Sequence, residues 1–283
     1  MNGRESGVAL AIVVWFIAGM SLLVAGIVAH ARVDTQTTQI HLARAKSVAA
    51  GDGAINLAMI QRRQGYASAG QGPQVSESRH VIGDAEVVVR LYPADGFIDM
   101  SSAPREVLAA LFHIAGNMDK GEANFVAENV VRWRGGRTEN KNTRSRNSGK
   151  REFYSLEDML RVEGVSRSLL DGIRDFAIAG SWAQSSTDWS ASPAAMMEIL
   201  KSIDPGRAGQ AEKRRSASAR AAGSGTSQRG SGLTGAFRAD AYVNYGGRNW
   251  LRRRWLTMDG QTPGGLPWAV VRTEAPRVVP GEL

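Results

Sequence analysis

The side chains best suited to catalysis or metal binding do not gather in this sequence. The four histidines, His30, His41, His80 and His113, show no ligand spacing, and there is no cysteine to act as a nucleophile, metal ligand or disulfide partner. The sequence contains no Gly-x-Ser-x-Gly elbow, Walker loop or dinucleotide fingerprint. We therefore predict a protein without enzymatic activity.

One segment resembles a hairpin that binds nucleic-acid phosphates. Residues 155–176 read as helix, tight turn and helix, with Ser155 and Ser166 as caps and Gly164 in the turn. Such hairpins bind phosphate through backbone amides exposed between two glycines. The second glycine is missing here and Glu163 would repel phosphate. We do not expect nucleic acid binding through this turn.

A second basic feature is the run Arg252-Arg253-Arg254, which lies between Trp250 and Trp255. Arginines and aromatic rings together could bind single-stranded nucleic acid by charge and stacking. Such a run more often marks a solvated basic face of a strand hairpin, and that is our prediction here. The net charge of +8 favours anionic lipid, nucleic acid or acidic proteins without choosing among them.

The first structural element that the sequence predicts is an uncharged N-terminal segment. No ionisable side chain occurs over residues 8–29, a length of about 33 Å as a helix and enough to cross a bilayer. A buried soluble helix is the weaker alternative at this length. A signal peptide cut near Ala29 and Ala31 is another, although the apolar stretch is long and only Arg4 precedes it. We predict a transmembrane helix over 8–29.

The helical pattern continues past the span, over residues 30–64. Leu42, Ala45 and Ala49 recur at helical spacing, and their small size would let another helix approach closely. We predict one long helix, bent at most near Gly51 and Gly53, with a partner contact along this seam.

The remaining pattern alternates strands and capped helices. Strands are predicted at 86–92, 95–100 and 267–274, and a hairpin at 236–258 turning at Gly246 and Gly247. Helices are predicted at 101–116, with Ser102 as N-cap, and at 122–133. The Asp99 to Pro104 helix start recurs at Asp188 to Pro193, either as an internal echo or by coincidence of a common cap pattern. Residues 204–232 are rich in Gly, Ser, Ala and Arg, which predicts a flexible linker.

The order of these features resembles one family, the minor pseudopilin K (general secretion pathway protein K) of bacterial type II secretion systems. The resemblance covers most of the chain and depends on a short leader ending in Gly7 and on five further segments: residues 8–15, 96–104, 130–133, 154–164 and 188–193. No single segment is highly specific, and the resemblance lies in their order.

The resemblance implies a division of the chain and a processing step. Residues 1–7 would be a leader that a prepilin peptidase removes between Gly7 and Val8, with methylation of the Val8 amine. The fold would be α+β: a pilin-like fold in which the long helix packs on a small antiparallel sheet, with an inserted all-α domain. The pilin-like domain would comprise 65–101 and 188–283, and the inserted helical domain 102–187.

The resemblance also implies location and partners. The protein would be a single-pass protein of the cell inner membrane, with a cytoplasmic N-terminus and a periplasmic C-terminal domain. Members are thought to cap the pseudopilus tip with minor pseudopilins I and J and to help initiate assembly. A membrane-anchored DNA-binding module and a minor pilin of a type IV pilus remain open as alternatives.

The fifth residue of the predicted mature chain departs from the pattern common to pilin-like proteins. Most pilin-like proteins carry a glutamate at the fifth mature position, where this chain has Ile12. An apolar residue there suits a subunit with no neighbouring amine to pair with, because an unpaired carboxylate in a bilayer is costly. A lipid-facing residue without further meaning is the alternative.

The family also carries acidic calcium ligands near the tryptophan at 133. Here Arg132 and Arg134 flank it and a basic loop follows over 134–151. Cations among the ligands would repel calcium, so we expect no metal or other cofactor.

Overall fold

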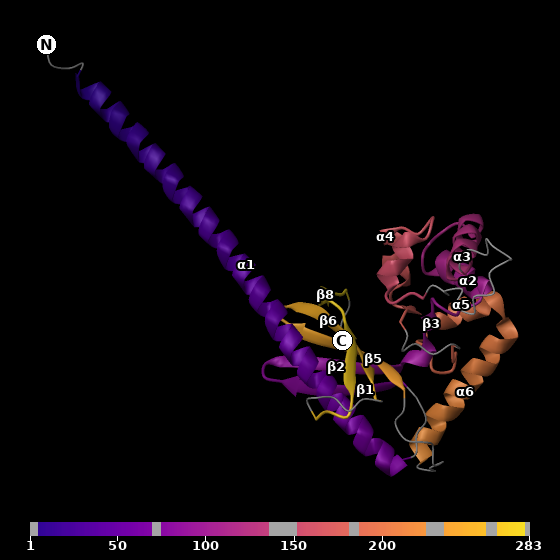
Figure 1. Ribbon diagram of the computed structural model, residues 1–283. Helices are drawn as coiled ribbons and strands as arrows, with labels where there is room; N and C mark the ends of the chain where they lie inside the picture. The colour runs from indigo at the N-terminus through magenta and orange to yellow at the C-terminus, as the bar shows by residue number, and fades with distance from the viewer. Residues whose placement is uncertain are drawn as a thin grey trace.

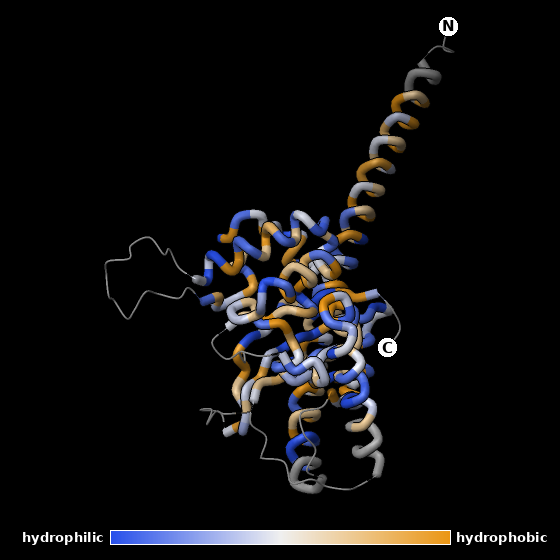
Figure 2. The backbone as a smooth tube through the Cα atoms, turned by 90° about the vertical axis from the view of Figure 1, so that its right-hand side faces the viewer, coloured by the Kyte–Doolittle hydropathy of each residue, from blue (hydrophilic) through white to orange (hydrophobic). Residues whose placement is uncertain are grey.

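The computed structural model describes residues 5–69, 75–135, 152–180, 187–224, 235–258 and 265–280. Helix α1 (Glu5–Ala69) is one continuous helix, as predicted, and its N-terminal part projects from the body while its C-terminal part lies on the sheet (Figure 1). The projecting part is predominantly apolar or neutral along its length (Figure 2). Gly51 and Gly53 do not interrupt the helix.

The sheet is antiparallel and has the strand order β1-β2-β5-β6-β7, with β8 also pairing with β6. Its strands are β1 (Ser76–Ile82), β2 (Ala85–Pro93), β5 (Ala236–Tyr245), β6 (Arg248–Thr257), β7 (Ala269–Thr273) and β8 (Arg277–Val278). The predicted hairpin is confirmed, and it turns at Gly246 and Gly247, which have φ angles of 62° and 69°. Strand β1 was not predicted, because five of its seven residues are polar.

Pairing of β2 with β5 joins two parts of the chain that are far apart in sequence. Val87, Val89, Ala241 and Val243 from these strands are buried against the α1 side chains Ala54, Ile55, Ala58 and Met59. Small alanines on both elements let the helix approach the sheet closely. The predicted architecture, a long helix on an antiparallel sheet with a helical insertion, is confirmed.

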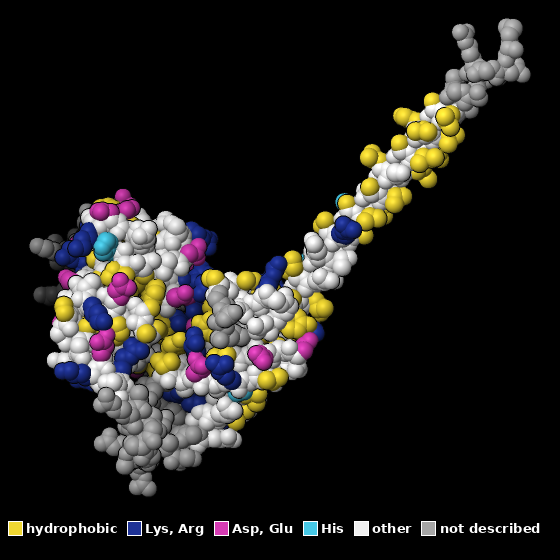
Figure 3. Space-filling model, turned by 180° about the vertical axis from the view of Figure 1, so that it is seen from behind, with side chains coloured by type: hydrophobic (Ala, Val, Ile, Leu, Met, Phe, Trp, Pro, Cys, Tyr) yellow, Lys and Arg dark blue, Asp and Glu magenta, His cyan; other side chains and the backbone are white. Residues whose placement is uncertain are grey.

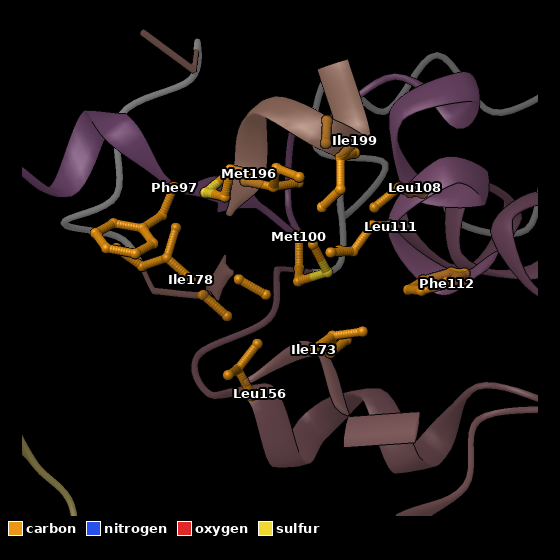
Figure 4. Packing of buried hydrophobic residues seen from close by; sticks show 14 of the residues in the cluster. Phe97, Met100, Leu108, Leu111, Phe112, Leu156, Ile173, Ile178, Met196 and Ile199 are labelled. Carbon is orange, nitrogen blue, oxygen red and sulfur yellow. The ribbon is translucent and has the colours of Figure 1, made fainter. Parts of the chain in front are cut away.

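The inserted region is mostly helical and has its own apolar core. It contains α2 (Arg105–Ile114), α3 (Lys120–Arg134), the 3-10 turn η2 (Leu156–Arg161) and α4 (Arg167–Ile173), and it is bounded by the parallel pair β3 (Ile98–Asp99) and β4 (Ala177–Ile178). A further 3-10 turn, η1 (Ala94–Gly96), precedes β3. Figure 4 shows Met100 among Leu111, Ile173 and Ile199 at the centre of this core.

The helical core extends past residue 187, where the pilin-like domain was predicted to resume. Helix α5 (Met196–Ile203) packs on α2, and α6 (Pro205–Ser224) packs on α5, so both belong with the inserted helices. The predicted flexible linker over 204–232 is therefore wrong for residues 205–224, while 225–232 lie outside the described residues. Its alanines and arginines favour helix, and Asp204 caps it by accepting the Arg207 amide at 2.9 Å.

The two similar helix starts adopt the same local geometry. Asp99 accepts the Ser101 amide and Asp188 accepts the Ser190 amide, each at 2.9 Å. Ser102 is not the N-cap of α2 as predicted, because its hydroxyl donates to Asp99 at 2.6 Å and the helix begins after Pro104. The local echo seen in the sequence is thus a repeated aspartate turn ahead of a helix.

Candidate assembly surface

The projecting part of α1 is a bare apolar rod. Its large side chains are exposed, with Trp15 at 81% and Leu22 at 79% of full exposure, and yellow side chains surround it in Figure 3. Among the described residues this is one helix long and apolar enough to cross a membrane, and none of its most apolar stretch is buried. It is consistent with a single-pass anchor.

The predicted processing and filament positions lie on this rod. Gly7 and Val8 belong to the first turns of α1, while leader residues 1–4 are outside the described residues. Ile12 follows one turn later and is 63% exposed.

The residues of the predicted seam, Leu42, Ala45 and Ala49, are exposed, and Leu42 also lines a groove beside the β5 and β6 hairpin. The sheet-facing row lies on the opposite side of the helix and includes Ala50 and Ala54. The structure thus separates two rows: one holds the helix on its own sheet, and the other is left uncovered. Periodicity alone did not distinguish them, because alanine occurs in both.

Asp52 fixes the helix to the sheet by a pair of ion contacts. Its Oδ1 lies 2.8 Å from Nε of Arg252, and its Oδ2 lies 2.6 Å from Nη2 of Arg254. The Arg252 and Arg254 side chains are 9% and 20% exposed, and Arg252 also donates to the Glu274 carbonyl at 2.8 Å. Buried guanidinium groups require such partners, because an unpaired buried charge is costly.

Gly51 makes this approach possible. A Cβ atom at Gly51 would lie 2.9 Å from Cβ of Arg252, closer than real Cβ contacts. The neighbouring Gly53 has more room, since its Cβ would lie 3.9 Å from Ile82 Cδ1. Of the two glycines that flank Asp52, only Gly51 is required by the close approach of β6.

Arg253 points to the other face of the sheet and holds the inserted region. It donates from Nε and Nη2 to both carboxylate oxygens of Asp240 at 2.7 and 3.0 Å, directly across the β5 and β6 pair. Its Nη1 lies 2.6 Å from Asp175, which follows α4. Asp175 also receives Arg277 at 2.7 Å and, through its carbonyl, Arg238 at 2.7 Å.

The protonation equilibria follow from this network. Burial alone would raise the pKa of Asp175, but the guanidinium groups of Arg253 and Arg277 outweigh it and lower that pKa to about 2. Burial lowers the pKa of Arg238, whose guanidinium lies 4.2 Å from the Phe97 ring centre and 3.0 Å from Asp240. Both ends of the network are thus charged at neutral pH.

The predicted solvated basic face over Arg252, Arg253 and Arg254 is wrong, and so is the nucleic-acid alternative for this run. Alternation along β6 sends two of the arginines to Asp52 on α1 and one to Asp240 and Asp175. A lone aspartate between two glycines on an otherwise alanine-rich helix was the available signal. Its partner Arg252 is 200 positions away, so no local pattern links the two residues.

The turn of the predicted hairpin at 155–176 packs against helix α3. Gly164, with φ of 87°, lies so close to α3 that a Cβ there would be 2.7 Å from Val126. Asn129 donates to the Glu163 carbonyl at 3.1 Å and fixes the turn against the helix. The Ser166 cap is confirmed, but the first predicted helix is a 3-10 turn, in which Leu160 is 39% exposed.

The arginines beside Trp133 are used structurally. Arg134 donates to the carbonyls of Met100 and Ala103 at 3.0 and 2.8 Å, and Arg132 donates to Asn129 at 3.3 Å. Among the described residues, no three His, Asp or Glu side chains lie close enough together to hold a metal ion. Residues 136–151, most of the predicted basic loop, are outside the described residues.

Comparisons with known proteins give one structural likeness. No protein-family model matches the sequence, and no curated protein matches it. Among solved structures, the chain is similar to a chain of the GspK-GspI-GspJ complex from the enterotoxigenic Escherichia coli type 2 secretion system. The identity is 12%, the TM-score is 0.49, and the alignment covers 88% of this chain and 100% of that one.

Proposed function

We propose that this chain is a minor pseudopilin of a type II secretion system, capping the pseudopilus tip and helping to initiate its assembly. The observation that carries the proposal is α1, a single helix that is bare and apolar at one end and fixed to an antiparallel sheet at the other. A rod of this kind serves both as a membrane anchor before assembly and as the packing element of a filament.

The proposal includes processing and location. A prepilin peptidase would cut between Gly7 and Val8 and the new Val8 amine would be methylated. The mature protein would cross the inner membrane once, with its N-terminus in the cytoplasm and the sheet and helical insertion in the periplasm. Ile12 would suit a subunit with no neighbour above it.

Partner binding would use the uncovered row of α1. Leu42, Ala45 and Ala49 are exposed although the helix is otherwise packed on its sheet, and small residues let helices approach closely. We propose minor pseudopilins I and J as the partners at this row. No enzymatic step is part of this function, which depends on assembly alone.

The mass of the mature protein tests the proposal directly. The full chain is expressed with a prepilin peptidase, and we expect a protein that begins at Val8 and carries one methyl group. A start at Arg32 would indicate a secreted protein, and an intact Met1 would indicate an ordinary anchor; either result contradicts the proposal. Replacing Gly7 should block the cut, whereas Gly3→Ala should not.

Co-purification separates secretion from a type IV pilus. Under the proposal, the tagged chain recovers minor pseudopilins I and J from membranes in a stable complex. Recovery of type IV minor pilins in their place would assign the chain to a pilus.

A further inference from the structure

A groove lies at the free end of the β5 and β6 hairpin, beside α1. It has a volume of about 510 Å³ and is formed between residues 36–43 of the helix and the turn and adjoining residues of the hairpin. The two sides approach closely, because a Cβ atom at Gly246 would lie 3.6 Å from Cβ of Ala43. Pockets for small ligands span roughly 300 to 1,000 Å³, so a groove of this size can hold a short peptide segment.

The two walls of the groove differ in chemistry. Ile40 and Leu42 belong to the helix wall and are 43% and 54% exposed. Trp250 and Arg248 belong to the hairpin wall. Arg248 is exposed and forms no ion pair with any carboxylate that the structure describes. A segment that matches both walls carries a carboxylate next to an apolar side chain.

Strand β8 directs the C-terminal part of the chain toward this groove. It pairs antiparallel with β6, and the pairing continues to the Val279 amide, which donates to the Asn249 carbonyl at 2.9 Å. The same register places Pro280 beside Arg248, the first residue of β6. Chain that follows Pro280 in this direction therefore passes the end of the hairpin, where the groove lies.

The next three residues have the chemistry that the groove requires. They are Gly281, Glu282 and Leu283, and they lie outside the described residues. A glycine accepts the backbone bend that would turn the chain from the edge of the sheet toward α1. Consecutive side chains of an extended chain point to opposite sides, so a segment along the groove presents its glutamate to one wall and its leucine to the other.

We propose that residues 281–283 dock in this groove, with the Glu282 carboxylate paired with Arg248 and Leu283 packed on the helix wall. The charges of the pair are complementary, and the leucine removes apolar surface of the wall from water. The segment follows directly on residues that are paired with β6, so its local concentration at the groove is high and weak contacts suffice.

The docked segment covers Leu42, which belongs to the row of α1 assigned above to partner binding. A partner helix must displace residues 281–283 before it contacts Leu42. This competition depends on the proposed function, whereas the docking itself does not.

Disulfide cross-linking of the full chain in detergent tests the docking. Because the chain has no cysteine, Gln39→Cys with Leu283→Cys allows one disulfide within the chain. Gln39 lines the groove, while His41 is also exposed but is not part of the lining, so His41→Cys with Leu283→Cys is the matched control. We expect the Gln39 pair to oxidise at least about tenfold faster than the His41 pair, since tethered groups held together react at a raised effective concentration.

Charge reversals in the Gln39→Cys, Leu283→Cys chain test the ion pair. Arg248→Glu and Glu282→Arg should each slow the cross-link by about threefold or more, since an exposed ion pair contributes up to about a fivefold factor and reversal adds repulsion. The two reversals together should restore the rate. Arg79→Glu, exposed on the edge strand β1, should leave the rate unchanged.

Three results would overturn the docking: equal oxidation of the Gln39 and His41 pairs, charge reversals without effect, or no rescue by the double reversal. A disulfide that forms between two chains and not within one would assign the groove to a second copy and would also overturn it.

Recovery of minor pseudopilins I and J tests the competition separately. The chain locked by the disulfide between positions 39 and 283 should recover at least about fivefold less of the complex than the same chain after reduction. Equal recovery would refute the competition. Failure of the wild-type chain to recover either partner would contradict the proposed function, while the cross-linking rates still decide the docking.

Discussion

Asp52 and Arg252 are 200 positions apart in the sequence, yet Oδ1 of the aspartate lies 2.8 Å from Nε of the arginine. Together with Arg254, this contact joins the long helix to strand β6 of the sheet. These ion pairs therefore link the helix that would enter the membrane directly to the sheet.

Removing the Asp52 carboxylate should weaken that joint. Asp52→Ala leaves two largely buried guanidinium groups without their partner, and breaking a buried pair costs about 3 to 5 kcal/mol of unfolding free energy. Because Asp52 itself is 21% exposed, we expect the lower end of that range. Urea unfolding of the full chain in detergent measures it. Asp84→Ala loses the exposed ion pair with Lys46, so it should lower the free energy of unfolding much less than Asp52→Ala does. Equal losses in the two variants would show that the Asp52 ion pairs are no stronger than an exposed pair.

The two glycines beside Asp52 should respond in opposite directions to the same substitution. Alanine raises helix propensity by about 1 kcal/mol at either position. At Gly51 the new Cβ meets the Arg252 side chain at 2.9 Å, so we expect a net loss of about 1 to 2 kcal/mol from overpacking. At Gly53 there is room, and a small gain is expected. Thermal unfolding of both variants checks the prediction, and a gain at Gly51 would contradict the close approach.

The ionisation of Asp175 should make the free energy of unfolding depend on pH. Its folded-state pKa of about 2 lies below the ordinary value of 3.8, so its ionised form stabilises the fold above about pH 4. That contribution is lost as the pH falls from about 4 to about 2, because the carboxyl group is protonated first in the unfolded state and, near pH 2, also in the folded state. Asp175→Asn should flatten the dependence of the urea midpoint in this window. Asp171→Asn, which loses an exposed pair with Arg174, should leave the dependence as in the wild type. A side chain that is 45% exposed implies an effect smaller than full burial would give.

The uncovered row of α1 makes a prediction about assembly. Ala45→Arg places a long cation where small residues would let a partner helix approach, so recovery of the complex with minor pseudopilins I and J should fall by about tenfold or more. Because Ala45 is exposed, unfolding of the isolated chain should not change. Ala217→Arg on exposed α6 is the matched control and should preserve recovery. Wild-type recovery of the Ala45→Arg complex would reject this row as the contact.

The elements predicted correctly are those with a strong local pattern. The helix from Glu5 to Ala69, the hairpin at Gly246 and Gly247 and the Ser166 cap each follow from periodicity or turn chemistry within a few residues. Strand β1 and helix α6 were missed because β1 is mostly polar and α6 has no large apolar side chain, so both resemble loops until packing partners are known. Local signals therefore defined most of the fold.

Which charged side chains pair with one another was much harder to predict from the sequence. The arginine run on β6 has the composition of a solvated strand, and only the placement of Asp52, Asp240 and Asp175 around it shows that it is neutralised. Which face of α1 meets the sheet was equally hidden, since alanines occupy both faces. The proposed roles of Gly7, Val8 and Ile12 stay predictions, because they concern processing and partners that one chain does not contain.

The pairing of α1 with β5 and β6 has a consequence for the order of synthesis. The helix emerges from the ribosome first, but the strands that cover Ala50, Ala54 and Ile55 are among the last segments made. Folding of the body is therefore a late, long-range event, which is slow compared with local helix formation. Until residue 257 is translated, the sheet-facing apolar side of α1 cannot be covered by its own C-terminal hairpin.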